Sequence, residues 1–203
     1  MTSWGMFDPK LIRNLRRFSN KKEAAAYLGL IGDLISSLAL TGDDQRFHFN
    51  PTTGSKYFLP LTINNRYMVM KGRDVEGVPT WWLIHPGPHA VTEVEAGLMR
   101  RTLSFAHKRH DAPESAPVLA QYPVPFVLEH RERLIARVLD LAARELAACR
   151  GTTPYRASHN SLAYALALDD AAREEGLAAV TFVGFTRPRR SIRSDSTSAP
   201  PPG

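Results

Sequence analysis

The chain has 203 residues, of which 43% are hydrophobic, and its formal net charge is +6. This length suits one domain with at most a small appendage, and the apolar content excludes a chain that is disordered throughout. The single cysteine, Cys149, excludes an internal disulfide framework, and no apolar run approaches the roughly 20 residues that span a bilayer. We expect a cytoplasmic protein, because the basic N-terminal stretch does not lead into the apolar segment of a secretory signal.

Two caps predict helices at the start of the chain. Asp8-Pro9 is a typical helix start, and Asn20 with Glu23 predicts a second helix that ends near residue 42. The second helix is apolar enough to be largely buried. Its two internal glycines, Gly29 and Gly32, indicate either that another element packs closely against it or that the helix is weakened.

Residues 45–85 alternate short β-rich runs with turn signals, which predicts a four-stranded antiparallel meander. If Asn64-Asn65 forms a two-residue turn, Ile63 pairs with Arg66, Leu61 with Met68 and Leu59 with Met70. Opposed residues share a face. The predicted core face carries Tyr57, Leu59, Leu61, Ile63, Met68 and Met70. The second, mixed face carries Lys56, Phe58, Pro60, Thr62, Tyr67, Val69 and Lys71.

The rest of the chain is predicted to be mostly helical. Thr92 with Glu95 predicts a helix that extends to near His110. The four prolines of residues 111–125 favour a connector over the surface, and this connector is a possible boundary between two parts of the domain. Helices follow at about 126–150 and 158–175, and a final strand at 179–185. The fold class is therefore α+β, with a single domain over residues 1–186 and a disordered basic tail over residues 187–203.

The distribution of charge favours a polyanionic partner. Arginine outnumbers lysine 20 to 6, and arginine suits bidentate contact with phosphate. Six cations and no acid lie between Asp8 and Glu23: Lys10, Arg13, Arg16, Arg17, Lys21 and Lys22. Four more arginines follow residue 186. Nucleic acid and anionic lipid both fit this pattern, and a solvated basic face is the alternative.

The mixed face of the meander adds aromatic side chains to these cations. Bases stack on aromatic rings without sequence preference, and flanking cations attract the backbone. The predicted contacts on this face are Lys56, Phe58, Tyr67, Lys71 and Arg73. The alternative is that these residues pack under a helix. For the N-terminal helices we expect phosphate contact without base-specific reading.

A histidine-acid group follows the meander, with His85, His89, Glu93 and Glu95 close in sequence. Imidazoles and carboxylates are metal ligands, but this spacing crosses Pro86-Gly87-Pro88 and places no two rings on one helical face. We therefore predict no metal site, and we predict an inert thiol at Cys149.

Residues 155–183 lead from a strand-like start through Ser158, His159 and Asn160 into an alanine-rich helix and a strand-like end. This segment resembles the part of the ParB/sulfiredoxin fold in which a turn opens a helix and cradles phosphate. The resemblance implies that Ser158, His159 and Asn160 bind a nucleotide phosphate and that His159 and Asn160 are catalytic.

Three functions are consistent with these observations. The leading prediction is a nucleic-acid-associated accessory protein that binds through phosphate contacts. The alternative is a ParB/sulfiredoxin-like nucleotide-binding or phosphoester-hydrolysing protein, such as a plasmid-encoded effector of conjugative transfer or segregation. A second alternative is a protein-interaction module whose Met and Trp residues form a groove for a protein partner. The sequence predicts no particular cofactor.

Overall fold

The computed structural model of the chain describes residues 9–42, 44, 46–49, 58–64, 66–87, 102–104, 117–148 and 166–184. Six strands pair in one antiparallel sheet with the order β1-β2-β3-β4-β6-β5. They are β1 (Phe47–Phe49), β2 (Phe58–Ile63), β3 (Arg66–Lys71), β4 (Thr80–His85), β5 (Thr102–Ser104) and β6 (Val118–Pro123). The predicted four-stranded meander is confirmed as β1 to β4.

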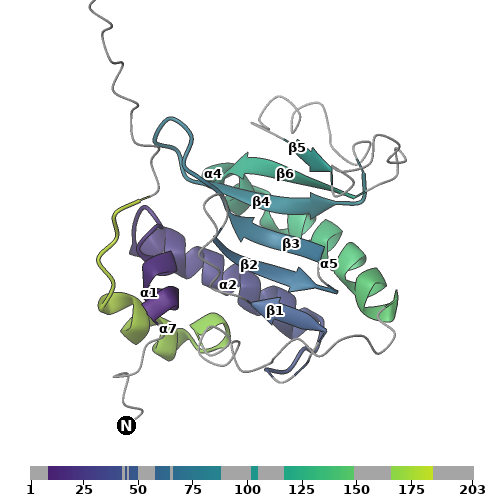
Figure 1. Cartoon of the computed structure of the whole chain (residues 1–203), viewed down its shortest axis with the longest axis horizontal. Helices are drawn as coiled ribbons and strands as arrows, with labels where there is room; N and C mark the ends of the chain where they lie inside the picture. The colour runs from purple at the N-terminus through teal and green to yellow at the C-terminus, as the bar shows by residue number, and fades with distance from the viewer. Residues whose placement is uncertain are drawn as a thin grey trace, which may run out of the picture.

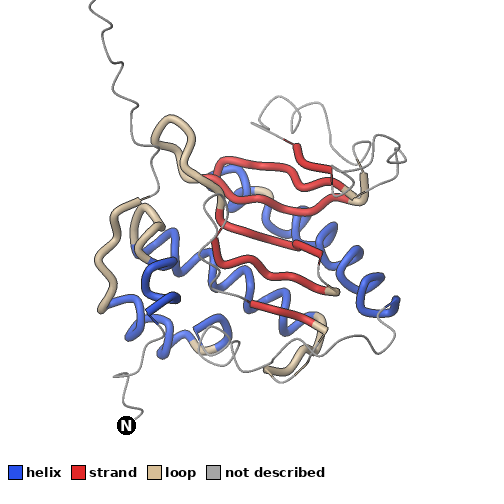
Figure 2. Tube along the Cα trace, viewed as in Figure 1, coloured by secondary structure: helices blue, strands red, loops and turns tan. Residues whose placement is uncertain are grey.

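The helices gather on one face of this sheet (Figures 1 and 2). They are α1 (Pro9–Leu15), α2 (Lys21–Ser37), α4 (Val124–Glu129), α5 (Arg131–Ala148) and α7 (Asp170–Ala178). The longer helices α2 and α5 lie along the sheet, while α1 and α7 lie at its β1–β2 side beside α2. This arrangement confirms the α+β class. Among the described helices, none is long and apolar enough to cross a membrane.

Helix α2 has a well-defined cap at each end. The Asn20 side chain accepts a hydrogen bond from the Glu23 backbone N–H at 2.8 Å, as predicted. The helix ends at Ser37, earlier than predicted, because Ala39 adopts a left-handed conformation with φ of 49°. The Ala39 and Leu40 N–H groups then donate to the carbonyls of Ser36 and Ile35, which is a Schellman motif with alanine in place of the usual glycine.

The β2–β3 hairpin departs from the predicted register after its first two pairs. Ile63 pairs with Arg66 as predicted, but Leu61 pairs with Val69, so Met68 is an extra residue on β3. Such a bulge reverses the alternation of faces beyond it. The expected pair Leu61–Met68 is therefore wrong. A second irregularity, on β2 between Phe58 and Leu61, restores the predicted register at the pair Phe58–Lys71.

Because of the bulge, Val69 and Lys71 lie on the helix-covered face, while Met70 lies on the opposite face beside Trp82. The next strand, β4, is buried on both faces, since Trp81 and Trp82 are only 0% and 3% exposed and neighbouring strand residues point to opposite sides. The tryptophans and methionines of the meander are thus core residues, and they do not form the partner groove of the interaction alternative.

Two strands lie where the sequence predicted other structure. β6 occupies the described end of the expected connector 111–125 and pairs with β4 over six residue pairs, from Thr80–Pro123 to His85–Val118. β5 lies within the expected helix 92–110 and pairs with β6. Both predictions failed at these residues because β6 pairs along the free edge of β4 and β5 along the free edge of β6, and hydrogen bonding along a sheet outweighs a weak local pattern.

Residues 180–184 do not form the expected final strand. The Val183 N–H donates to the Arg16 carbonyl at 2.8 Å, and the Gly184 N–H donates to the Phe18 carbonyl at 3.2 Å. Both carbonyls belong to the turn that follows α1. We call residues 180–184 the C-terminal strap, because they cross the α1–α2 junction instead of joining the sheet.

Candidate nucleic-acid interface

Three arginines from two distant parts of the sequence gather at the α1–α2 junction. Arg13 and Arg17 belong to α1 and the turn that follows, and Arg73 belongs to the loop between β3 and β4. The pKa of Arg17 is lowered, first by burial and then by the positive charges of Arg13 and Arg73. Like charges have this effect only at short range. We call Arg13, Arg17 and Arg73 the arginine cluster.

A buried ionic network joins the two segments that carry the cluster. The Lys71 ammonium lies 3.0 Å from Glu23 Oε1 and 2.5 Å from Asp74 Oδ1, and all three side chains are at most 4% exposed. Ser19 completes the connection, because its hydroxyl donates to Asp74 at 3.0 Å and its N–H donates to Glu23 at 2.8 Å. The β3–β4 loop is therefore fixed against the start of α2.

Lys71 cannot contact nucleic acid, contrary to the sequence prediction. Its side chain is 0% exposed and its charge is matched by two carboxylates. The ammonium also lies 5.9 Å from the centre of the Phe18 ring, and the Trp81 indole N–H donates to Glu23 at 3.1 Å. The bulge in β3 explains the error, since it turns Lys71 from the mixed face toward α2.

Side chains of the neighbouring strands β4 and β6 fix the backbone of Arg73. Its carbonyl accepts hydrogen bonds from the Thr80 hydroxyl at 2.6 Å and from the Gln121 amide at 3.3 Å. The preceding Gly72 passes so close to Trp82 that a Cβ there would lie 2.8 Å from the indole nitrogen. The loop closes in a tight turn at Glu76 and Gly77, both with positive φ. Arg73 thus extends from a rigid backbone.

Of the other residues predicted to contact nucleic acid, some are exposed and one is held in an ion pair. Arg16 and Lys22 are exposed beside the cluster in sequence. Lys21 forms an ion pair, because its ammonium lies 2.5 Å from a carboxylate oxygen of Glu174 of α7. Tyr67 is 40% exposed, but it lies at the other end of β3 from Lys71, so the structure does not bring it to the arginine cluster.

Several predicted residues lie outside the described part of the chain. These are Lys56, His89, Glu93, Glu95, Cys149, Ser158, His159 and Asn160; for Lys10 and Phe58 only the backbone is described. The phosphate-binding turn implied by the ParB/sulfiredoxin resemblance therefore stays a prediction from the sequence.

His85 is buried within β4 and not at the surface. Its Nε2 lies 2.7 Å from the Tyr122 hydroxyl of β6, and the two rings meet edge to face. Among the described residues, no three His, Cys, Asp or Glu side chains gather as metal ligands would.

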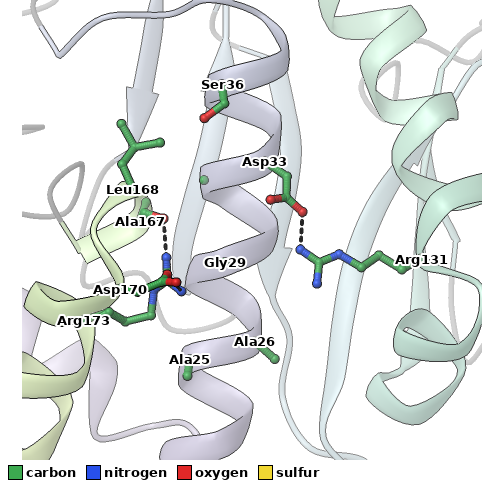
Figure 3. Close-up of a pocket in the computed structure, with 11 residues that line it drawn as sticks. Ala25, Ala26, Gly29, Asp33, Ser36, Arg131, Ala167, Leu168, Asp170 and Arg173 are labelled. Carbon is green, nitrogen blue, oxygen red and sulfur yellow. Dashed lines mark hydrogen bonds and ion pairs between the residues drawn. The ribbon is translucent and has the colours of Figure 1, made fainter.

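A groove of about 400 Å³ lies on the outer side of α2 (Figure 3). Arg131 of α5 borders it and pairs with Asp33, while Arg173 of α7 donates to the carbonyls of Leu166 and Ala167. Small residues floor the groove because α7 and the short helical segment before it, residues 166–168, approach α2 closely. Both arginines have structural roles here, so the groove gives no comparable anion site.

Sequence reasoning found the three arginines separately but did not place them together. It assigned Arg13 and Arg17 to one surface and Arg73 to another, whereas contacts around Ser19 and Asp74 join the two. A signal was present in Lys71 and Asp74, whose opposite charges flank Gly72 and Arg73 in the sequence. Comparison of the chain with protein-family models, with curated proteins and with solved structures found no match.

Proposed function

We propose that this protein binds nucleic acid through its phosphate backbone, with the arginine cluster as the central contact and Arg16 and Lys22 beside it. The observation that carries the proposal is the Ser19–Asp74 hydrogen bond at 3.0 Å, which joins the turn that carries Arg17 to the loop that carries Arg73; the positive charges of Arg13 and Arg73 accordingly lower the pKa of Arg17. Gathering like charges costs free energy in the unbound protein, and a bound polyanion removes that cost.

Local electrostatics support an anionic ligand. Lys71 is matched by the carboxylates of Glu23 and Asp74, whereas Arg13 and Arg73 act on Arg17 as neighbouring positive charges. The guanidinium groups can each donate two parallel hydrogen bonds to a phosphate. The rigid backbone of Arg73 reduces the entropy that is lost when its side chain binds.

We propose contact with the sugar-phosphate backbone of the nucleic acid, without recognition of its bases. Phosphate contacts fix the position of a protein on nucleic acid but do not read the sequence. Tyr67, an exposed aromatic residue in the described part of the meander, lies away from the cluster at the other end of β3. We therefore expect similar affinity for unrelated sequences of equal length.

The test is a fluorescence-anisotropy titration of the full chain with labelled nucleic acid between about 50 and 200 mM salt. Three to five phosphate contacts predict a log-log slope of about −3 to −5 with duplex DNA, and a dissociation constant on the order of 10⁻⁵ M at physiological salt. Single-stranded DNA and duplex RNA of equal length identify the preferred form.

Two results would contradict the proposal. One is the absence of binding to every nucleic acid at low salt. The other is binding to vesicles of anionic lipid without binding to nucleic acid, because this would assign the cationic surface to a membrane.

A further inference from the structure

The C-terminal strap holds the chain on both sides of Arg17. The Val183 N–H donates to the Arg16 carbonyl at 2.8 Å, and the Gly184 N–H donates to the Phe18 carbonyl at 3.2 Å. Arg16 and Phe18 are the two neighbours of Arg17 in the sequence. Figure 2 shows the strap rising along α1 toward the β3–β4 loop. The backbone that carries Arg17 is therefore fixed by a segment from the far end of the described chain.

The strap also packs against the hydrogen bond that joins the two segments of the arginine cluster. A Cβ at Gly184 would lie 3.7 Å from Asp74 Oδ2 and 4.0 Å from Ser19 Cα. Asp74 Oδ2 is the atom that accepts the Ser19 hydroxyl at 3.0 Å. Asp74 directly follows Arg73 in the sequence. The end of the strap thus lies where the turn that carries Arg17 meets the loop that carries Arg73.

The strap is anchored to the rest of the fold at its other end. Val180 is 9% exposed, and its N–H donates to the Leu177 carbonyl of α7 at 3.2 Å. Phe182 packs against the core, whereas Val183 is exposed. Gly184 has a φ of 69°, a conformation that other residues rarely adopt. A segment that is packed at one end and hydrogen-bonded at the other holds its target in a defined place.

We propose that the strap positions Arg17 for phosphate, so that nucleic acid binds best when the strap is docked and in turn stabilises the docked strap. This inference rests on the proposed function. Loss of the bonds to Arg16 and Phe18 gives the turn after α1 other conformations, and affinity falls with the fraction of molecules that present Arg17 correctly. The coupling is reciprocal, because a ligand that binds the docked state better shifts the population toward it. The alternative is that the strap contributes to stability alone.

The first experiment is a double-mutant cycle on the affinity of the full chain for duplex DNA at about 100 mM salt. Val183→Pro removes the N–H that donates to Arg16, whereas Val183→Ala keeps it. Val183→Pro should weaken binding by about threefold or more, and Val183→Ala should match the wild type. In the Arg17→Gln background, Val183→Pro should cause less than about a twofold further loss, because the side chain that the strap positions is already gone.

The second experiment measures amide hydrogen exchange of the wild type, with and without saturating duplex DNA. The Val183 and Gly184 N–H groups should exchange at least about threefold more slowly in the bound protein, because binding favours the docked strap. The Val180 N–H bonds to α7 and is the internal control, which should change less. In Arg17→Gln, saturated in the same way, the added protection should disappear. Simple shielding of the strap by DNA would persist in that variant.

The outcomes separate this inference from the proposed function. If the wild type binds DNA but Val183→Pro equals Val183→Ala, or weakens binding equally with and without Arg17, the inference is wrong and the proposed function stands. Unchanged exchange of the Val183 and Gly184 N–H groups on binding also overturns it, and this measurement decides alone if Val183→Pro does not fold. If the wild type binds no nucleic acid, the proposed function itself fails, and this inference fails with it.

Discussion

At the scale of single residues, Lys71 has the environment in which a charge contributes most to the fold. It is fully buried and lies between the carboxylates of Glu23 and Asp74. Replacing one partner of a buried ion pair leaves the other charge uncompensated. Lys71→Met should therefore lower the free energy of unfolding by about 3–5 kcal/mol, as measured by urea denaturation.

Lys21→Met is the matched control, because it removes a lysine whose ion pair with Glu174 is exposed. Exposed pairs contribute at most about 1 kcal/mol. Equal losses of stability in the two variants would show that the Lys71 network does not hold the β3–β4 loop in place.

Tyr27 gives a residue-scale prediction for alkaline pH. Its hydroxyl donates to the Leu59 carbonyl at 2.5 Å, and burial raises the pKa of Tyr27 well above its usual value. The folded protein keeps this proton, whereas the unfolded chain releases it near pH 10. The stabilising effect of neutral Tyr27 is therefore complete below about pH 10 and declines by about 1.4 kcal/mol per pH unit above it.

Tyr27→Phe isolates this effect. At pH 7 the variant should be less stable by about 1–3 kcal/mol, because the Leu59 carbonyl loses its donor. Urea denaturation at pH 7 and at about pH 11 should show that the difference between wild type and variant shrinks at the higher pH. A difference that stays constant would mean that Tyr27 ionises as readily in the folded state as in the unfolded state.

At the scale of elements, the contact of α2 with the short helical segment before α7, residues 166–168, explains Gly32 but not Gly29. A Cβ at Gly32 would lie 2.1 Å from the Ala167 carbonyl oxygen, whereas a Cβ at Gly29 would lie 3.5 Å from the flexible Arg173 side chain. Alanine stabilises a helix by about 1 kcal/mol relative to glycine where space allows.

We therefore expect opposite effects from the same substitution three residues apart. Gly29→Ala should leave the free energy of unfolding unchanged or raise it by up to about 1 kcal/mol. Gly32→Ala should lower it by about 1–3 kcal/mol, because backbone must move to admit the methyl group. Thermal or urea denaturation measures both, and similar effects would contradict the close approach of the residue 167 carbonyl to α2.

The same elements show why some local patterns predicted structure and others did not. The Asn20 cap and the turns of the meander depend on residues within a few positions, so the sequence predicted them correctly. The residue that approaches Gly32 is Ala167, far away in the chain, and the sequence did not identify it. The Met68 bulge, the pairing of β6 with β4 and the path of the strap depend on partners far away in the chain. A pattern read along the sequence does not contain those partners.

At the scale of the whole molecule, the basic charge was visible in the sequence but its arrangement was not. The sequence predicted Arg13, Arg17, Arg73 and Lys71 alike as contacts to nucleic acid. Folding buries Lys71 between carboxylates and brings the three arginines together, so only the arginines suit a polyanion. The burial of a lysine and the meeting of α1 with the β3–β4 loop are tertiary events that composition cannot predict.

The most direct test of the account compares the salt dependence of DNA binding in two variants that each lose three charges. One is the cluster variant, Arg13→Gln, Arg17→Gln and Arg73→Gln; the other replaces Arg133, Arg137 and Arg144 of α5 in the same way. We expect the log-log slope of the cluster variant to be smaller than that of the wild type by about 2.7, and the α5 variant to keep the wild-type slope. Both must first match the wild type in circular dichroism. Equal slopes in the two variants would contradict a nucleic-acid interface centred on the arginine cluster.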